Sequence, residues 1–176
     1  MSKLQLFAYT DMKGDSVSLD NDIPNLASVG FLKRAKSLRV HGDPWVVFSD
    51  KNYKGEFKIY KEGDYNSIPD FEDMICSVRV VNGGLYDPQI TVYEHINYGG
   101  RSLILTKNVE DLSSYEMSNM VSSHKVQNGV WILYDKKHFQ GSKMVALAGD
   151  AVPNYKDIGW NDKVNSLKFF SPLDSE

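Results

Sequence analysis

Short runs of hydrophobic residues, separated by turn-forming residues, recur along the whole chain. Residues 45–48, 89–93 and 131–134 are examples, and they are rich in β-branched and aromatic side chains bounded by Gly, Pro, Asn or Asp. Runs of this kind predict short β-strands. No long window keeps its apolar residues at the 3.6-residue spacing of an amphipathic helix. The pattern therefore predicts an all-β protein, built as a sandwich or a barrel.

A short pattern of two aromatic residues and a glycine occurs four times. It reads aromatic, four residues, aromatic, one residue, glycine, and it occupies residues 48–55, 93–100 and 134–141. A weaker copy at residues 7–14 has Met12 in place of the second aromatic. About thirty residues after each first aromatic comes a serine, and these serines are Ser37, Ser77, Ser123 and Ser166. The aromatic pattern and the serine keep nearly the same spacing in all four copies. This regularity predicts four structural repeats.

The repeats pair at a longer period, which predicts two domains. Phe7 and Tyr93 are 86 positions apart, as are Trp45 and Trp131. Between the two pairs lies a segment with two glycines and a proline, which is typical of a linker. The predicted organisation is an N-terminal domain at residues 1–82, a linker at residues 83–88 and a C-terminal domain at residues 89–176.

Each repeat is long enough for about four short strands. Four antiparallel strands with a long return connection form a Greek key, and two Greek keys in each domain would make a sandwich. The two aromatic residues of each pattern would close over a folded hairpin, and the glycine would give its turn a positive φ. The serine can anchor the folded hairpin through a hydrogen bond between its hydroxyl and the backbone.

Composition and charge narrow the classes of function. The formal net charge of −3 over 176 residues gives no basic face for nucleic acid. The apolar run at the N-terminus is too short for a signal peptide, and no run approaches the roughly 18 apolar residues of a membrane helix. We therefore expect a cytoplasmic protein with no nucleic-acid partner and no membrane insertion. The single cysteine, Cys76, excludes an internal disulfide and is expected to be a small buried hydrophobe.

These motifs resemble the βγ-crystallin superfamily, and the resemblance extends from Phe7 to Phe169. It rests on the four hairpin patterns, the four serines and the segment at residues 160–167. It implies two wedge-shaped domains, each made of two Greek keys intertwined about a pseudo-twofold axis. The chain looks more similar to non-lens members, because its last two repeats keep a calcium signature. We expect a monomer whose domains pair within the chain, with a dimer as the alternative.

The calcium signature of that family reads Asn/Asp, Asn/Asp, any, any, Ser/Thr, Ser. The resemblance implies that each site takes the fifth-position side chain and the third-position carbonyl from one repeat. It also implies a second-position side chain from the partner repeat and a carbonyl from the hairpin. Calcium suits such a set because it takes six to eight oxygen ligands. Residues 118–123 depart from the signature only at Ser118, and residues 161–166 depart only at Asn165.

Carried over to this sequence, the resemblance implies two candidate calcium sites in the C-terminal domain. The stronger candidate has the carbonyls of Glu94 and Met120, the hydroxyl of Ser122 and the carboxylate of Asp162. The weaker candidate has the carbonyls of Asp135 and Lys163 and the amide oxygens of Asn165 and Asn119. It ranks lower because it has no side-chain carboxylate, and fewer ligand charges mean weaker binding. The alternative is a degenerate family member whose sites no longer bind calcium, since Asn, Asp and Ser are also ordinary loop residues.

The corresponding positions in the N-terminal domain predict no calcium there. Lys36 would lie opposite Asp73, and Cys76 would lie opposite Lys33. Each of these sites would contain an ammonium group, which offers hydrogen-bond donors but no acceptor. We expect an ion pair between Lys36 and Asp73 to take the place of a bound cation.

Two functions of different classes follow. The first is a non-enzymatic structural protein whose C-terminal domain is stabilised by calcium. The alternative is a recognition module for glycans, lipids or proteins, as a part of a larger toxin-like or stress-related protein. The sequence shows no combination of acid, base and nucleophile that would indicate an enzyme. The four histidines also lack the spacing of a zinc site. Trp45 and Trp131 open the second repeat of each domain, which favours core positions over an exposed sugar-binding platform.

Overall fold

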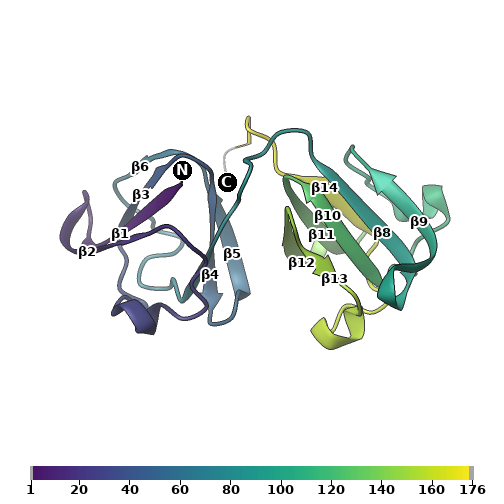
Figure 1. The fold of residues 1–176 in the computed structure, drawn as a ribbon, viewed down its shortest axis with the longest axis horizontal. Helices are drawn as coiled ribbons and strands as arrows, with labels where there is room; N and C mark the ends of the chain where they lie inside the picture. Colours follow the sequence, from purple (N-terminus) through teal and green to yellow (C-terminus); the bar gives the residue numbers. More distant parts are fainter. Residues whose placement is uncertain (1, 175–176) are drawn as a thin grey trace. The chain divides into compact units, whose positions relative to one another are not determined.

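The computed structural model describes residues 2–174, which form β-strands joined by loops and short 3-10 turns (Figure 1). The chain divides into two compact units, the first ending at Gly84 and the second spanning Leu85–Asp174. This division falls within residues 83–88, the segment that the sequence predicts as a linker. Among the described residues, no helix has the length and apolarity needed to cross a membrane. The all-β prediction is confirmed.

The N-terminal unit contains seven strands in two sheets. The sheets have the strand orders β2-β1-β3-β6 and β5-β4-β7, and all pairings are antiparallel. A 3-10 turn, η1 (Leu26–Val29), lies between β2 and β3. The strands are β1 (Lys3–Tyr9), β2 (Lys13–Leu19), β3 (Ser37–His41), β4 (Trp45–Asp50), β5 (Lys54–Tyr60), β6 (Gly63–Tyr65) and β7 (Ser77–Val80).

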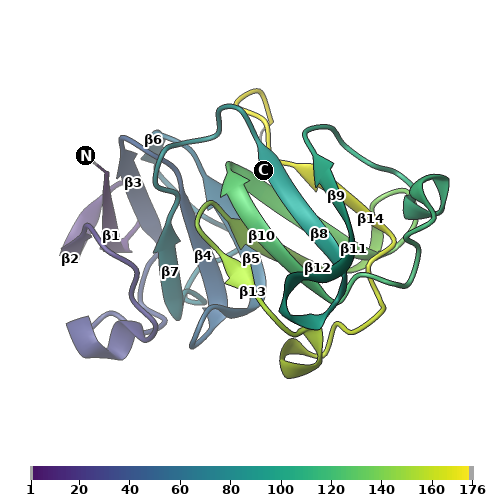
Figure 2. The same cartoon turned by 45° about the vertical axis from the view of Figure 1, so that its right-hand side comes forward.

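The C-terminal unit repeats this arrangement. Its sheets have the orders β13-β10-β8-β9 and β12-β11-β14, and Figure 2 shows β8 and β10 running next to each other. The strands are β8 (Gln89–His95), β9 (Gly99–Leu105), β10 (Ser123–Asn128), β11 (Val130–Lys136), β12 (Gln140–Leu147), β13 (Ala151–Val152) and β14 (Ser166–Phe169). The 3-10 turns are η2 (Ile96–Tyr98), η3 (Leu112–Tyr115) and η4 (Tyr155–Ile158).

The two repeats of each unit exchange strands. In the second and fourth repeats, the short strands β6 and β13 leave their own repeat and pair with β3 and β10. The first and third repeats make the reciprocal exchange through single bridges, from Ile23 to Val78 and from Val109 to Leu167. Each repeat is therefore a Greek key that completes the sheet of its partner, and the predicted sandwich of two Greek keys in each domain is confirmed.

The folded hairpins take the form that the sequence predicts. In the third repeat the rings of Tyr93 and Tyr98 pack edge to face, with centroids 5.5 Å apart. Ser123 donates a hydrogen bond to the His95 carbonyl (2.7 Å) and accepts one from the Tyr98 N–H (3.1 Å). Gly100 has φ +72°, and a Cβ added there would lie 2.5 Å from the His95 ring. The same pair of hydroxyl bonds is made by Ser37, Ser77 and Ser166.

Each unit has its own hydrophobic core, and the core of the C-terminal unit contains a buried polar pair. Trp45 and Trp131 are completely buried, one in each core, as predicted. Cys76 is also buried, and burial raises the pKa of its thiol. His124 occupies the position that Leu38 holds in the N-terminal unit, and its Nδ1 forms a hydrogen bond with the Tyr155 hydroxyl. Burial lowers the pKa of His124 to about 4.

Candidate metal centre

The fifth position of every signature is fixed to its hairpin by a backbone hydrogen bond. Its N–H donates to the carbonyl of the first aromatic, at 2.9 Å from Ser122 to Tyr93 and 2.8 Å from Asn165 to Tyr134. The other two repeats make the same bond from Lys36 to Phe7 and from Cys76 to Phe48. The backbone therefore places the fifth side chain beside the hairpin in all four repeats, whatever that side chain is.

The second position has a left-handed backbone in every repeat. Its φ lies between 56° and 57° in all four copies, which are Lys33, Asp73, Asn119 and Asp162. Asn and Asp tolerate this region better than most other residues that have a Cβ. The N–H of Asp162 donates to the Val121 carbonyl of the partner repeat (3.4 Å). This contact lies next to Ser122 and brings the second position of one repeat beside the fifth position of the other.

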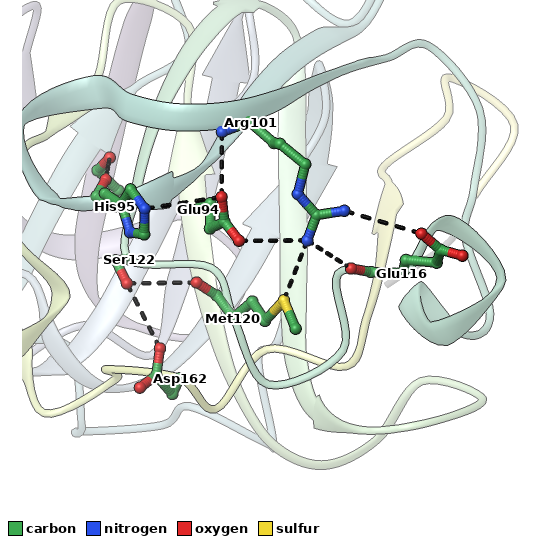
Figure 3. Close-up of polar contacts among 8 residues, drawn as sticks. Glu94, His95, Arg101, Glu116, Met120, Ser122 and Asp162 are labelled. Atoms are coloured by element: carbon green, nitrogen blue, oxygen red, sulfur yellow. Dashed lines mark hydrogen bonds and ion pairs between the residues drawn. The ribbon is translucent and has the colours of Figure 1, made fainter.

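The residues of the stronger candidate site line one open pocket (Figure 3). Ser122 Oγ lies 3.3 Å from the Met120 carbonyl oxygen and 3.4 Å from Asp162 Oδ1. Good O–H···O bonds are shorter, at about 2.5–3.0 Å. Two oxygens that each lie about 2.4 Å from one calcium ion, at right angles to each other, are about 3.4 Å apart. The two distances from Ser122 Oγ thus fit the spacing of neighbouring calcium ligands.

Glu94, the fourth residue of this site, lies where β8 departs from regular pairing. The register between β8 and β9 shifts between Tyr93 and His95, so Glu94 sits at the irregularity. Its carboxylate accepts hydrogen bonds from the Arg101 side chain (3.2 Å) and the Arg101 N–H (3.3 Å). These bonds lower the pKa of Glu94. The side chain of Glu94 is therefore engaged by Arg101, in keeping with a backbone role for this residue at the site.

Arg101 joins the hairpin to the loop that carries the third-position carbonyl. Besides Glu94, one guanidinium nitrogen contacts the Glu116 carbonyl (2.9 Å) and the Met120 sulfur (3.2 Å), as Figure 3 shows. Sequence reasoning missed Arg101 because it lies outside the six-residue signature. A signal was present in its position, since it directly follows the hairpin glycine Gly100.

The residues of the weaker candidate site also lie close together, but the Asn165 amide turns its nitrogen towards the site instead of the predicted oxygen. The Asn165 Nδ2 group donates to the Asp135 carbonyl (2.7 Å), to Asn119 Oδ1 (3.0 Å) and to the Lys163 carbonyl (3.4 Å). The Asn165 Oδ1 atom accepts a hydrogen bond from the Ser118 hydroxyl. All four predicted ligand residues therefore meet at one point, with the amide nitrogen of Asn165 facing the other three oxygens.

The N-terminal unit has the predicted ion pair. Lys36 Nζ lies 2.6 Å from Asp73 Oδ2 and 3.4 Å from Glu72 Oε1, and the bond to Asp73 raises the pKa of Lys36. At the other signature, Cys76 Sγ lies 3.6 Å from the Met74 carbonyl oxygen. In residues 2–174, no group of three or more His, Cys, Asp or Glu side chains is arranged to hold a metal. The candidate sites rest instead on carbonyl, hydroxyl and amide oxygens with one carboxylate.

Comparison with known proteins gives related sequences over nearly the whole chain. The chain is 36% identical over 167 residues to the epidermal differentiation-specific protein of Cynops pyrrhogaster, covering 95% of this chain and 49% of that protein. It is 28% identical over 174 residues to the human beta/gamma crystallin domain-containing protein 2, covering 95% of this chain and 10% of that protein. The chain thus spans about half of the first relative and a tenth of the second.

A solved structure and a family profile complete the comparison. Geodin, a beta-gamma crystallin from Geodia cydonium, is 20% identical with a TM-score of 0.41, covering 96% of this chain and 99% of geodin. The profile described as Beta/Gamma crystallin matches residues 3–81 and 89–170, which together contain all four repeats. The chain therefore belongs to the βγ-crystallin family.

Proposed function

We propose that this chain is a non-enzymatic structural protein whose C-terminal domain is stabilised by one calcium ion. The observation that carries the proposal is the position of Ser122 Oγ, at ligand-like distances from oxygens of Met120 and Asp162. Met120 and Ser122 belong to the third repeat, and Asp162 belongs to the fourth. With the Glu94 carbonyl, these groups would supply four protein oxygens, and water would complete the coordination of calcium.

The stabilisation follows from the fact that the ligands come from two repeats. When bound, calcium would supply positive charge that holds these oxygens together. Unfolding separates the repeats and would destroy the site, so an ion that binds only the folded domain raises its free energy of unfolding. The gain is about 2.7 kcal/mol when free calcium exceeds the dissociation constant about a hundredfold.

The charges around the pocket favour weak binding. Asp162 is the one side-chain carboxylate among the proposed ligands, and Lys156 brings a positive charge to the lining of the same pocket. Sites with few ligand charges bind calcium weakly. We infer that the ion acts as a permanent stabiliser where calcium is abundant, and not as a sensitive switch.

Calorimetric titration of the intact chain with calcium, together with melting temperatures, tests this function. The variant of choice is Asp162→Gly, because glycine removes the carboxylate and still accepts the φ of 57° at this position. Asp73→Gly is the matched control, since Asp73 has the same φ in the N-terminal unit. We expect calcium to bind and to raise the melting temperature of the intact chain and the control, and both effects to be lost in Asp162→Gly. Absence of binding to the intact chain at millimolar calcium would overturn the proposal.

A further inference from the structure

We propose that the second calcium site of the C-terminal domain is closed by its own Asn165, whose amide NH2 group takes the place of the cation. The inference deepens the proposed function, because it concerns the partner site in the same domain and sets how many ions that domain binds. The three oxygens that would accompany Asn165 around a cation are the three acceptors of the Asn165 amide, namely the Asp135 carbonyl, Asn119 Oδ1 and the Lys163 carbonyl.

The distances show that the amide satisfies these oxygens directly. Nδ2 lies 2.7 Å from the Asp135 carbonyl and 3.0 Å from Asn119 Oδ1, both within the range of good N–H···O bonds. The Lys163 carbonyl is more distant, at 3.4 Å. An amide nitrogen has two hydrogens, so two strong bonds and one weak contact are what it can offer. A cation entering this point would have to displace all of them.

The orientation of the amide is dictated by its neighbours. The backbone carbonyls of Asp135 and Lys163 can only accept hydrogen bonds. If the Asn165 amide were turned by 180°, its oxygen would face these two acceptors, and a cation or a donor such as water would have to enter to relieve the repulsion. In the observed orientation the Asn165 oxygen instead accepts from Ser118. Every polar atom of the Asn165 side chain therefore has a partner without any metal.

The contact between Ser118 and Asn165 also accounts for the pattern of departures from the signature. Ser118 is the one departure in the third repeat, and Asn165 is the one departure in the fourth, 47 residues later. The two side chains are hydrogen-bonded to each other. The equivalent first-position residue at the other site, Asn161, instead contacts Asp162 Oδ2 (3.2 Å). The two departures thus form one structural unit that holds the amide in the closed orientation.

The chemistry of closure differs from that in the N-terminal domain. There the charged ammonium of Lys36 stands beside a carboxylate. At Asn165 a neutral amide stands among neutral oxygens, because the other side chain of the site is Asn119. Calcium gains little at a site without carboxylates and must lose hydration to enter it. The closed amide is therefore the stable state of this site over the calcium concentrations at which the first site fills.

Calorimetric calcium titration of intact chains carrying Asn165→Asp tests the closure. The substitution keeps the shape of the side chain and replaces the donating NH2 group with an acceptor that carries charge. We expect a single bound calcium in the wild-type chain and two in Asn165→Asp. Asn128→Asp, an exposed position of the same domain, is the charge control and is expected to bind one. If Asn165→Asp fails to fold, the double variant Asn119→Asp/Asn165→Ser gives the second site the serine and the carboxylate of the first site, and it carries the same expectation.

The outcomes separate closure from the proposed function. In the double variant Asp162→Gly/Asn165→Asp, the first site is removed, and a single bound ion would then report the opened second site alone. A wild-type chain that binds no calcium while Asn165→Asp binds one would overturn the proposed function and leave the closure standing. Two ions bound to the wild-type chain would overturn the closure, and so would an unchanged stoichiometry in folded Asn165→Asp or, if that variant does not fold, in Asn119→Asp/Asn165→Ser.

Discussion

The ammonium nitrogen of Lys36 lies 2.6 Å from Asp73 Oδ2, at the two signature positions that Ser122 and Asp162 hold in the C-terminal domain. The N-terminal domain therefore keeps the backbone arrangement of the candidate site and places a tethered ammonium group in it. The backbone is the same in both domains, since Lys36 makes the same hairpin bond as Ser122. What separates the two sites is the side chain at the fifth position.

The first prediction follows from this comparison. Replacing Lys36 with serine should create a calcium site in the N-terminal domain, because a hydroxyl would then face the carboxylate of Asp73, with Glu72 close by. Calorimetry should show one more bound ion than in the wild-type chain. Lys33→Asn is the control, since its partner at the fifth position is Cys76, whose soft thiol suits calcium poorly. An unchanged stoichiometry in Lys36→Ser would show that the ammonium is not what excludes the ion.

The second prediction concerns Arg101 as a positioning residue of the proposed site. Arg101→Gln should weaken calcium binding by about tenfold, because outer contacts that orient metal ligands typically have effects of 10–100-fold. The matched control is Arg34→Gln, since Arg34 makes related contacts in the N-terminal domain, with Asp15 and the Gly30 carbonyl. That variant should leave calcium affinity unchanged. Equal affinities for Arg101→Gln and the wild-type chain would remove Arg101 from the site.

The third prediction is a pH dependence of the C-terminal domain. The folded pKa of His124, about 4, lies below its ordinary value of 6.5, so the unfolded chain binds a proton at a higher pH than the folded chain does. The contribution of neutral, buried His124 to the free energy of unfolding is therefore fully present above pH 6.5, and it is lost as the pH decreases towards 4. The total loss is about 3 kcal/mol, at about 1.4 kcal/mol per pKa unit.

Urea unfolding between pH 7 and pH 4, followed for each domain, would measure this effect. The variant His124→Leu/Tyr155→Phe removes both members of the buried pair and should flatten the pH dependence of the C-terminal transition. The N-terminal transition is an internal reference, because the histidine of that domain, His41, is exposed. The interpretation would be wrong if the double variant kept the slope of the wild-type chain.

The fourth prediction concerns the serines that anchor the hairpins. Ser123→Ala should destabilise the C-terminal domain by about 1–3 kcal/mol, because the N–H of Tyr98 and the carbonyl of His95 lose a buried partner. Ser77→Ala should have a similar effect on the N-terminal domain. Ser102 is exposed, so Ser102→Ala should change the free energy of unfolding by less than about 0.5 kcal/mol. Denaturant unfolding of the intact chain measures all three.

Much of the fold could be predicted from the sequence, because its determinants repeat. The hairpin serines and aromatic pairs have the same physical task in each repeat, and Ser123 and Ser166 make the bonds expected of them. The exchange of β6 and β13 between sheets could not be predicted in the same way. These strands have three and two residues, too few for an alternating pattern to indicate which sheet they join.

The candidate site could be predicted only as a set of positions. The second position favours Asn or Asp for its backbone alone, because its φ is positive whether or not the side chain faces a cation, although Lys33 also adopts this φ. Asp73 illustrates this, since it has the same φ as Asp162 and pairs with a lysine. The direction of the Asn165 amide was also beyond the sequence. It depends on two backbone carbonyls and on Ser118, which only the folded domain brings together.

The reciprocal bridges, Ile23 to Val78 and Val109 to Leu167, limit how a protein of this architecture can change in length. A repeat copied on its own would carry a strand with no sheet to join and would leave an open edge on its own sheet, which invites association with another chain. Repeats can therefore be gained or lost in pairs without leaving an unfolded remainder. An odd repeat would have to recruit its missing half from a second molecule, so duplication and deletion act on whole domains.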